Sequence, residues 1–439
     1  MIIMLAGSVL FSCKKMATSE VPPNQLTNDK VFTDTTSLTA ATAGLFTQLA
    51  TVDANLVRNL SLYTDELKTT AVSATNTEFS NSSLTVTNSS VLSIWQNLYR
   101  TIYMANAIIN GLKISTLPDG AKNTALGESR FIRGYCYLYL TRLFGDVPLL
   151  LTTDVKVNAA AVKTNSTLVL QQVISDFSIA KQLLTTDYPL NNGKTTANTY
   201  AALAYLSLAS LEAGQYNRAD SAATAVINSG KYSLLSDLSK ICTENNSEAI
   251  FQLWNQNGFS PLNSVAITGV PPNQITGSLY SAFTSSDKRK NIWISSITVS
   301  GTTYYFPYKY RQRTVTSGLN AEYTTYMRLD EVYLIRSEAR ARNSDLSGAL
   351  ADINIIRNRA GLPSLALITK GDILKANLLE RQLELFNENG SRFFDLKRFG
   401  LIDQTLSPLK PLWKATGRLF PIPQTEILND PNLTQNQGY

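Results

Sequence analysis

The clearest structural pattern in the chain is the stretch TTANTYAALAYLSLASLEAGQYNRADSAATAVINSGKYS, residues 195–233. Apolar residues recur every three or four positions, a break falls at Gly214-Gln215-Tyr216, and a second apolar face of small residues follows. The two faces are Tyr200, Ala201, Ala204, Tyr205, Leu208 and Leu211, and then Ala219, Ala222, Ala223 and Val226. Because alanines at a helix crossing let two helices approach closely, the stretch predicts a tetratricopeptide-like helix pair.

A second copy of this pattern runs from Leu329 to Leu362, with its break at Asn343-Ser344. Its apolar positions are Val332, Leu334, Ile335 and Ala339 before the break, and Ala349, Ile353 and Ile356 after it. Three further runs with helical spacing cover residues 92–109, 131–143 and 169–184. We therefore expect a mainly α fold with tetratricopeptide-like helix pairs as its scaffold.

Residues 234–320 have a different character and separate the two helix pairs. Ala249 to Trp254 reads as a strand, and the rest is rich in Gly, Pro, Asn, Ser and aromatic residues, with one short helical patch from Ile275 to Phe283. Long irregular segments on a rigid scaffold are common places for binding surfaces. We expect a single domain over residues 31–439, in which a scaffold of 31–233 and 321–439 carries this loop-rich, short-strand insertion.

The amino terminus has the features of a lipoprotein leader. Residues 2–12 form an apolar run that is too short to cross a bilayer but suits a signal peptide, although no Lys or Arg precedes it. The run ends at Leu10-Phe11-Ser12-Cys13, which is similar to the motif where cleavage frees a cysteine for lipidation. We expect a signal peptide over 1–12, lipidation at Cys13 and a polar tether over 13–30.

Composition excludes several function classes. The net charge is +6, but the 39 Lys and Arg residues form no block of like charge, so we expect no nucleic-acid partner. The chain has no histidine, which excludes Ser-His-Asp and Cys-His nucleophiles and H-E-x-x-H zinc sites but leaves paired-carboxylate chemistry open.

The two remaining cysteines, Cys136 and Cys242, have no C-x-x-C spacing, so we expect them to be buried thiols. A disulfide between them is left open. We expect no metal and no cofactor.

Six short blocks, in order along the chain, resemble one known family. They are Trp95-Gln96-Asn97-Leu98-Tyr99; Glu128-Ser129-Arg130-Phe131 with Arg142-Leu143-Phe144-Gly145-Asp146-Val147-Pro148; Arg328-Leu329-Asp330-Glu331-Val332-Tyr333-Leu334; Arg359-Ala360-Gly361-Leu362-Pro363; Glu380-Arg381-Gln382-Leu383-Glu384-Leu385 with Arg392-Phe393-Phe394-Asp395-Leu396-Lys397-Arg398; and Phe420-Pro421-Ile422-Pro423. Their order resembles the SusD/RagB family of nutrient-binding outer-membrane lipoproteins. The resemblance runs from the Cys13 motif to the end of the chain.

The resemblance implies a lipid-anchored protein on the outer membrane that faces the cell exterior. Its expected partners are an oligosaccharide or other oligomeric nutrient and a TonB-dependent transporter of the SusC type, and it is expected not to be an enzyme. An alternative from another class is a helical-repeat lipoprotein that binds peptides or proteins and no glycan. A soluble helical-repeat adaptor that binds peptides would also share the scaffold, and localisation separates it from the lipoprotein, because an adaptor has no use for a lipidated Cys13.

Family members hold glycans on aromatic and amide side chains from loops, and this chemistry suits a carbohydrate because sugar faces stack on rings while hydroxyls need polar partners. Two regions qualify: the loop of residues 63–88 before Trp95, and the insertion. The candidate ligand residues are Asp65, Asn76, Phe79, Asn81, Trp254, Asn255, Phe259, Trp293, Tyr304 and Tyr305. Trp254 ends an apolar strand, which leaves burial or exposure open, whereas Trp293 lies beside charged residues 287–290 and is expected to be exposed.

Several charges fall inside apolar helical segments and need partners there. They are Arg130, Arg142, Asp146, Glu338, Glu380, Arg392 and Asp395. We expect them to pair with one another or with helix ends, because an unpaired buried charge is costly. The neighbours Asp330 and Glu331 point about 100° apart on a helix, so they are not expected to form a catalytic pair.

Overall fold

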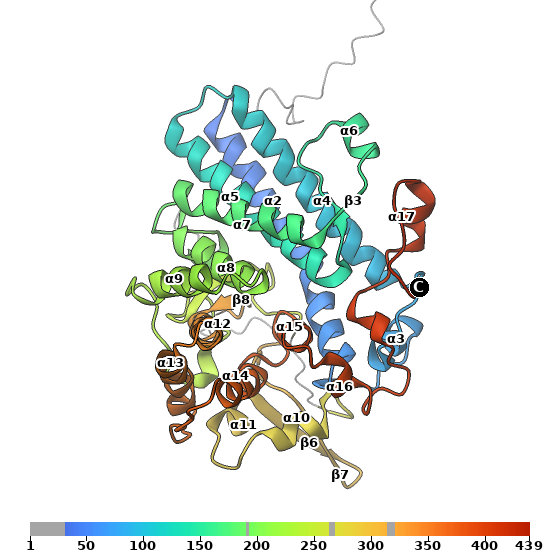
Figure 1. Ribbon diagram of the computed structural model, residues 1–439, viewed down its shortest axis with the longest axis vertical. Helices are drawn as coiled ribbons and strands as arrows, with labels where there is room; N and C mark the ends of the chain where they lie inside the picture. The colour runs from blue at the N-terminus through green and yellow to red at the C-terminus, as the bar shows by residue number, and fades with distance from the viewer. Residues whose placement is uncertain (1–30, 190–192, 263–267, 314–320) are drawn as a thin grey trace, which may run out of the picture.

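The computed structural model describes residues 31–189, 193–262, 268–313 and 321–439, and it is mainly helical as expected (Figure 1). The long helices are α2 (Thr35–Tyr63), α4 (Ser89–Gly111), α5 (Asp119–Phe144), α7 (Ser166–Leu183), α8 (Thr199–Glu212), α9 (Tyr216–Ile227), α12 (Leu329–Arg342), α13 (Leu346–Arg359) and α14 (Lys370–Leu385). The short ones are α3 (Ala74–Asn81), α6 (Val155–Ala159), α10 (Gly277–Ala282), α11 (Lys288–Trp293), α15 (Ser391–Arg398), α16 (Ile402–Leu406) and α17 (Gln424–Asn429). Of the described helices, none is long and apolar enough to span a bilayer.

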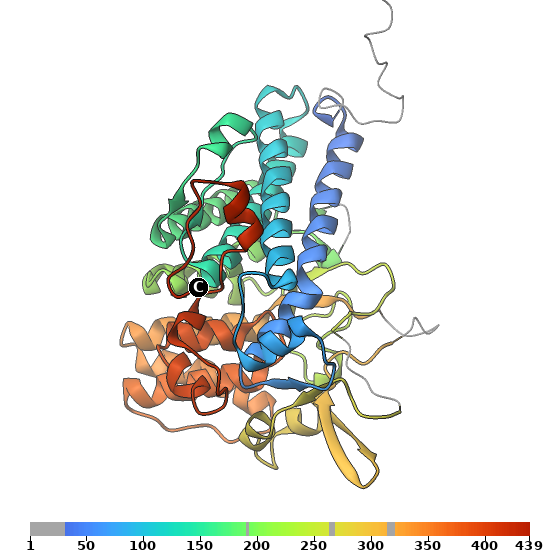
Figure 2. The same ribbon diagram turned by 90° about the vertical axis from the view of Figure 1, so that its right-hand side faces the viewer.

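The amino-terminal part of the scaffold is a layer of long helices. Helices α2 and α4 pack together, α4 packs on α5, and α5 packs on α7; Figure 2 shows α2, in blue, running beside α4. The predicted apolar stripe on α4 is confirmed, because Trp95, Leu98 and Ile102 are all buried. Helices α5 and α7 are further joined by Asp176, whose carboxylate accepts from Arg133 Nε at 2.8 Å and from Arg133 Nη2 at 2.7 Å.

The two predicted helix pairs are present as α8–α9 and α12–α13. The first pair breaks at Gly214, where φ is +70° and a side chain would be strained, and the second at Ser344, where φ is also +70°. Helix α8 begins at the cap residue Asn198, whose side chain accepts a hydrogen bond from Ala201 N at 2.8 Å. Helix α12 packs against both α8 and α9, which stacks the pairs. The likeness of these pairs to tetratricopeptide repeats stays a prediction.

The described strands form short antiparallel pairs. They are β1 (Leu67–Thr69) with β5 (Asn273–Ile275), β2 (Val147–Pro148) with β3 (Lys163–Thr164), β4 (Ala249–Leu253) with β8 (Thr324–Arg328), and β6 (Ile294–Val299) with β7 (Thr302–Pro307). The β4–β8 pair closes the insertion, since β4 lies near its start and β8 directly follows its end. The β1–β5 pair joins the loop before Trp95 to the insertion, so the two regions expected to carry a ligand meet on one side.

The insertion is held to the scaffold by buried charges. Arg289 on α11 is fully buried and its Nη1 lies 2.6 Å from Glu380 Oε1 and 2.8 Å from Glu384 Oε2, both on α14. Lys309 is also buried and donates to Glu388 Oε1 at 2.5 Å. The insertion is therefore packed into the body at its α11 end, while the β6–β7 hairpin lies at the opposite end of the molecule from α6 (Figure 1).

The charges that the sequence places in apolar helices do find partners. The pairs are Arg130 with Asp176, Arg142 with Glu212, Glu338 with Arg398, Glu380 with Arg289, Arg392 with Asp65, and Asp395 with Arg381. Asp146 instead accepts from Ser166 N at the start of α7, at 2.7 Å. The expected pairing of charges with one another or with helix ends is confirmed.

Candidate functional site

A cleft of about 600 Å³ lies between helix α2, the end of strand β4 and the segment before α8. Its apolar lining residues are Ala43, Phe46 and Ala50 on α2 together with Leu253 on β4. The other nine lining residues are polar or aromatic, and we call them the rim residues: Thr47, Thr195, Thr196, Asn245, Trp254, Asn255, Gln256, Asn257 and Tyr323. We call this the Trp254 cleft. A lining that combines apolar and aromatic residues with a few polar groups is typical of small-ligand sites.

Trp254 is exposed because of the turn that ends β4. Strand β4 is buried through Leu253, and the next side chain, Trp254, is 54% exposed. The chain then turns: Asn257 N donates to Asn255 Oδ1 at 2.9 Å and Gly258 N donates to Asn255 O at 3.0 Å. Gly258 has φ +69°, which glycine adopts without strain. The turn therefore presents a tryptophan ring and three amide side chains along one edge of the cleft.

Another part of the lining is fixed by a contact between the segments that hold Lys194 and Asn245. Lys194 N donates to Asn245 Oδ1 at 2.9 Å, and Asn245 N donates to Gln252 Oε1 at 2.9 Å. Gly193 has φ +60°, and a Cβ there would lie 2.1 Å from Asn245 Oδ1, so the close approach requires glycine. This contact positions Thr195 and Thr196 at the rim.

Tyr323 completes the rim beside Trp254. Burial raises the pKa of the Tyr323 phenol, the Glu244 carboxylate raises it further, and the Trp254 indole opposes the rise. The phenol therefore stays a neutral donor and acceptor near neutral pH. Burial also lowers the pKa of Lys194 to about 8, and its ammonium donates to Asn246 O at 2.6 Å and lies 5.0 Å from the centroid of the Tyr232 ring.

The cleft has the chemistry of a carbohydrate site. An exposed indole offers a flat face on which a sugar ring stacks, and amide and hydroxyl groups pair with sugar hydroxyls. Acid–base hydrolysis needs two facing carboxylates, and the described lining residues include neither Asp nor Glu. The arrangement therefore suits binding.

Two of the sequence-predicted ligand residues, Trp254 and Asn255, line this cleft. Phe259 follows the same turn and is partly buried, but it does not line the cleft. Asn76 and Asn81 lie on α3, and Tyr304 and Tyr305 on β7, so the structure does not bring these four residues to the Trp254 cleft. Tyr305 instead stacks on Tyr280, with ring centroids 4.0 Å apart.

Three predicted ligand residues are buried, and the expectation that they face a ligand is wrong. Trp293 is fully buried and its Nε1 donates to Leu238 O at 2.8 Å, because α11 turns its last residue into the body. Phe79 is fully buried and makes edge contacts with Tyr63 and Phe420. Asp65 is 4% exposed and forms a two-point ion pair with Arg392, at 2.8 Å for each contact.

Other cleft residues were missed by sequence reasoning. They are Ala43, Phe46, Thr47, Ala50, Thr195, Thr196, Asn245, Leu253, Gln256, Asn257 and Tyr323. Leu253 precedes and Gln256 and Asn257 follow Trp254-Asn255, so the run of one tryptophan and three amides was the available signal. The rest come from distant segments that only the fold brings together.

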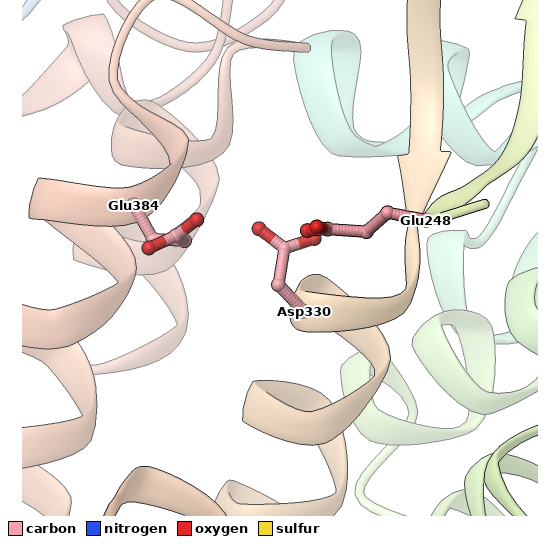
Figure 3. Close-up of side chains that lie close together, drawn as sticks. All are labelled: Glu248, Asp330 and Glu384. Atoms are coloured by element: carbon pink, nitrogen blue, oxygen red, sulfur yellow. The ribbon is translucent and has the colours of Figure 1, made fainter. Parts of the chain in front are cut away.

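A buried trio of carboxylates offers the geometry of a metal site but not its charge. Glu248, Asp330 and Glu384 place oxygens within 4.8 Å of one another, and Figure 3 shows the three side chains converging. Arginines already neutralise them: Asp330 Oδ2 lies 2.6 Å from Arg328 Nη1, and Glu248 Oε1 lies 2.6 Å from Arg359 Nη1. A divalent cation would sit against two fixed guanidinium groups, so we assign the trio to the structural ion network.

Two carboxyl groups of this trio have pKa values shifted in opposite directions. Burial raises the pKa of Asp330 well above its ordinary value, Arg328 opposes the rise, and the carboxylates of Glu248 and Glu384 add to it. Burial also opposes ionisation of Glu384, but Arg359, Arg289 and Arg328 outweigh it and hold the pKa of Glu384 well below its usual range. The two carboxyl groups are therefore shifted in opposite directions, Asp330 towards its neutral form and Glu384 towards its ionised form.

The two cysteines within the described residues are buried, as the sequence predicts. Cys136 and Cys242 are buried free thiols, and burial raises the pKa of each. They are not joined by a disulfide, so the alternative that the sequence left open is settled. Cys13 lies outside the described residues.

Comparison with known proteins agrees with the fold. A family model described as "SusD family" matches residues 288–417, and one described as "Starch-binding associating with outer membrane" matches residues 20–211. SusD-like protein P2 of Formosa agariphila is 25% identical, over 96% of this chain and 96% of its own length. A SusD superfamily protein from Bacteroides vulgatus has a TM-score of 0.81 at 22% identity, over 93% of this chain and 100% of that one. Surface glycan-binding protein A from Bacteroides thetaiotaomicron, in complex with laminarihexaose, has a TM-score of 0.77 at 18% identity, over 91% and 98%.

Proposed function

Because the chain belongs to the SusD/RagB family, we propose that it is a cell-surface lipoprotein that captures oligosaccharides in the Trp254 cleft and delivers them to a SusC-type TonB-dependent transporter. One observation carries the choice of site: the indole of Trp254 is 54% exposed at the rim of a cleft whose other rim residues are amides, threonines and a tyrosine. Single exposed apolar side chains are common on protein surfaces, but here the ring lies at a cleft beside amides and hydroxyls, which is the combination that carbohydrate binding uses.

We expect the cleft to bind and not to cut its ligand. The buried carboxylates of the trio and of Glu380 are occupied by arginines, so they are unavailable as an acid and base pair. A receptor that hands on its ligand must also release it, and a few stacking and hydrogen-bonding contacts give affinities between about micromolar and millimolar. The structure holds the cleft residues on a rigid scaffold, which limits the ordering cost of binding.

The glycan part of the proposal is tested by calorimetry of the purified protein against a panel of oligosaccharides, with product analysis after prolonged incubation. The expected result is saturable binding of at least one oligosaccharide, with a Kd in the range of about 1 µM to 1 mM and no shortened products. Binding of peptides without any oligosaccharide would support the helical-repeat alternative instead. Release of shorter products at an enzymatic rate would contradict a binding protein.

The membrane part of the proposal rests on Cys13 and the tether of residues 13–30. A lipid anchor confines the protein to the membrane surface, where a high effective concentration keeps it beside a transporter even through a modest interface. Changing Cys13 to Ala is expected to move the protein from the membrane fraction to the soluble fraction, because the lipid can no longer be attached. Fractionation followed by immunoblotting measures this, and Cys136→Ala, which changes a buried thiol, is the matched control.

Co-purification separates the anchor from the partner. Wild-type protein extracted from outer membranes in detergent is expected to bring a TonB-dependent barrel with it, identified by mass spectrometry. Full membrane retention of the Cys13→Ala protein in a strain that lacks the barrel would contradict lipid anchoring. Extraction of the wild type without any barrel would contradict delivery to a transporter but would not contradict glycan capture.

A further inference from the structure

The lining of the Trp254 cleft is uncharged although the whole chain is basic. Thirteen described residues line the cleft, and Asp, Glu, Lys and Arg are absent from them. The chain as a whole carries 39 Lys and Arg and 33 Asp and Glu residues and no histidine. The rim groups that remain are amides, hydroxyls and rings, which do not change charge near neutral pH.

Charged residues that lie next to rim residues in the sequence interact with other groups of the protein. The ammonium of Lys194 donates to Asn246 O and lies against the Tyr232 ring. The carboxylate of Glu322 is 3% exposed and accepts from Arg311 N at 2.7 Å and from Gln312 N at 2.9 Å. Glu244 interacts with the Tyr323 phenol, so the charge that does reach a rim side chain is negative.

This distribution of charge selects against an ionic ligand. A uronate or sulfate group that enters a cleft loses hydration, and only Arg, Lys or a metal ion compensates that loss well. Glu244 would add repulsion. Uncharged hydroxyls, in contrast, pair with amides that both donate and accept, and Asn255, Gln256 and Asn257 provide three of them in a row.

Thr196 gives an independent sign of a hydroxyl-bearing ligand. Its Oγ1 is buried, lines the cleft and has no hydrogen-bond partner among the described residues. A buried hydroxyl without a partner is destabilising, and a hydrogen bond from a ligand hydroxyl removes that cost. A charged group is not required at this position.

Building on the proposed function, we propose that the ligand of the Trp254 cleft is a neutral oligosaccharide, whose bound residues carry hydroxyls but no carboxylate, sulfate or free amine. The Trp254 ring stacks on one face of a sugar, and the amide and threonine side chains form hydrogen bonds with the hydroxyls of the sugar. Affinity then comes from stacking and neutral hydrogen bonds. Such binding depends weakly on salt, because no ion pair is screened.

The test compares charged and neutral oligosaccharides of matched length by calorimetry on the full chain. The panel contains laminari-, xylo-, manno- and N-acetylated chito-oligosaccharides as neutral probes, with oligogalacturonate and alginate oligomers as anionic probes and deacetylated chito-oligosaccharides as cationic ones. At least one neutral probe is expected to bind at least ten times more tightly than every charged probe. Its Kd is expected to change less than two-fold when NaCl rises from about 50 to 500 mM.

Two outcomes overturn this inference while leaving the proposed function intact. One is a charged probe that binds more tightly than all neutral probes, and the other is a loss of affinity of more than ten-fold with added salt. Absence of binding by every probe would instead contradict glycan capture itself, and the inference falls with it. The three results are distinguishable in one set of titrations.

A charge-introducing variant sharpens the test. Asn257 is exposed at the rim, so Asn257→Lys places a cation beside the cleft, whereas Asn76→Lys places one on α3, outside it. Asn257→Lys is expected to improve binding of the anionic probes at least three-fold, and Asn76→Lys is expected not to. Equal gains in both variants would mean that anionic probes respond to net charge and not to this cleft, which contradicts the proposed site.

Discussion

Replacing Arg328 by Met is expected to lower the free energy of unfolding by about 3–5 kcal/mol, because the change leaves several buried carboxylates short of a partner. Arg328 is 1% exposed and lies on β8, directly after the insertion. Its Nε and Nη2 each donate to Glu388 at 3.0 Å, and its Nη1 lies 2.6 Å from Asp330 and 3.1 Å from Glu248. The variant removes one guanidinium from a network that joins the insertion to the scaffold.

Chemical denaturation followed by circular dichroism measures this loss. Total stability of a protein is about 5–15 kcal/mol, so the expected shift of the midpoint is large. The matched control is Lys231→Met, which breaks an ion pair with Asp187 whose side chains are 49% and 82% exposed; its midpoint is expected to stay unchanged. An Arg328→Met protein as stable as wild type would show that the network does not hold the insertion in place.

Asp330→Asn tests the raised pKa of Asp330 in the same network. Burial raises the pKa of the folded carboxyl, whereas the unfolded carboxyl titrates near a pH of about 4, so the free energy of unfolding falls as the pH rises from there towards the folded pKa. An asparagine amide donates like the protonated acid but never ionises in the unfolded state. We therefore expect Asp330→Asn to be at least as stable as wild type at neutral pH, in contrast to the loss of stability expected on removal of Arg328.

Helix pairs could be predicted from sequence because their evidence is local. Alanines at 219, 222 and 223 and the glycine at 214 specify a close crossing and a break within one short stretch, and the structure has both. Helix α2 was not predicted, although its 29 residues make it the longest of the described helices. Its sequence is rich in threonine, a poor helix former, and tertiary packing of Leu45, Leu49 and Leu60 overrides that preference.

Exposure of single tryptophans depends on the fold and not on their neighbours in sequence. Trp293 follows the charged run 287–290, which suggested a surface position. Arg289 and Asp287 in that run are themselves buried and form an ion pair, so α11 packs against the body of the protein. Trp254 follows a buried strand and is exposed because the turn at Asn255 and Gly258 ends the strand there. The cleft residues of α2, of the segment before α8 and at Tyr323 come together only through long-range packing, which a single sequence does not specify.

Trp254→Ala is expected to weaken binding of the neutral oligosaccharide at least ten-fold, which corresponds to about 1.4 kcal/mol, because the stacking surface at the rim is lost. Calorimetry measures the affinity. The fold should be unaffected, since the side chain is 54% exposed and truncating it leaves little cavity, so the denaturation midpoint is expected to match wild type. Trp254→Phe keeps a ring at the site and is expected to recover part of the affinity.

The matched control for this prediction is Tyr304→Ala, which removes a partly exposed ring on β7 that does not line the cleft. Its affinity is expected to equal that of wild type. Tryptophan emission gives a second readout, because Trp95 and Trp293 are buried and Trp254 is the most exposed of the described tryptophans. A sugar that stacks on Trp254 shields the indole from water, so wild type should show a blue shift of the emission on binding that Trp254→Ala lacks. Unchanged affinity of the Trp254→Ala protein, together with lost affinity of the Tyr304→Ala protein, would place the ligand on the β7 hairpin and exclude the Trp254 cleft as its site.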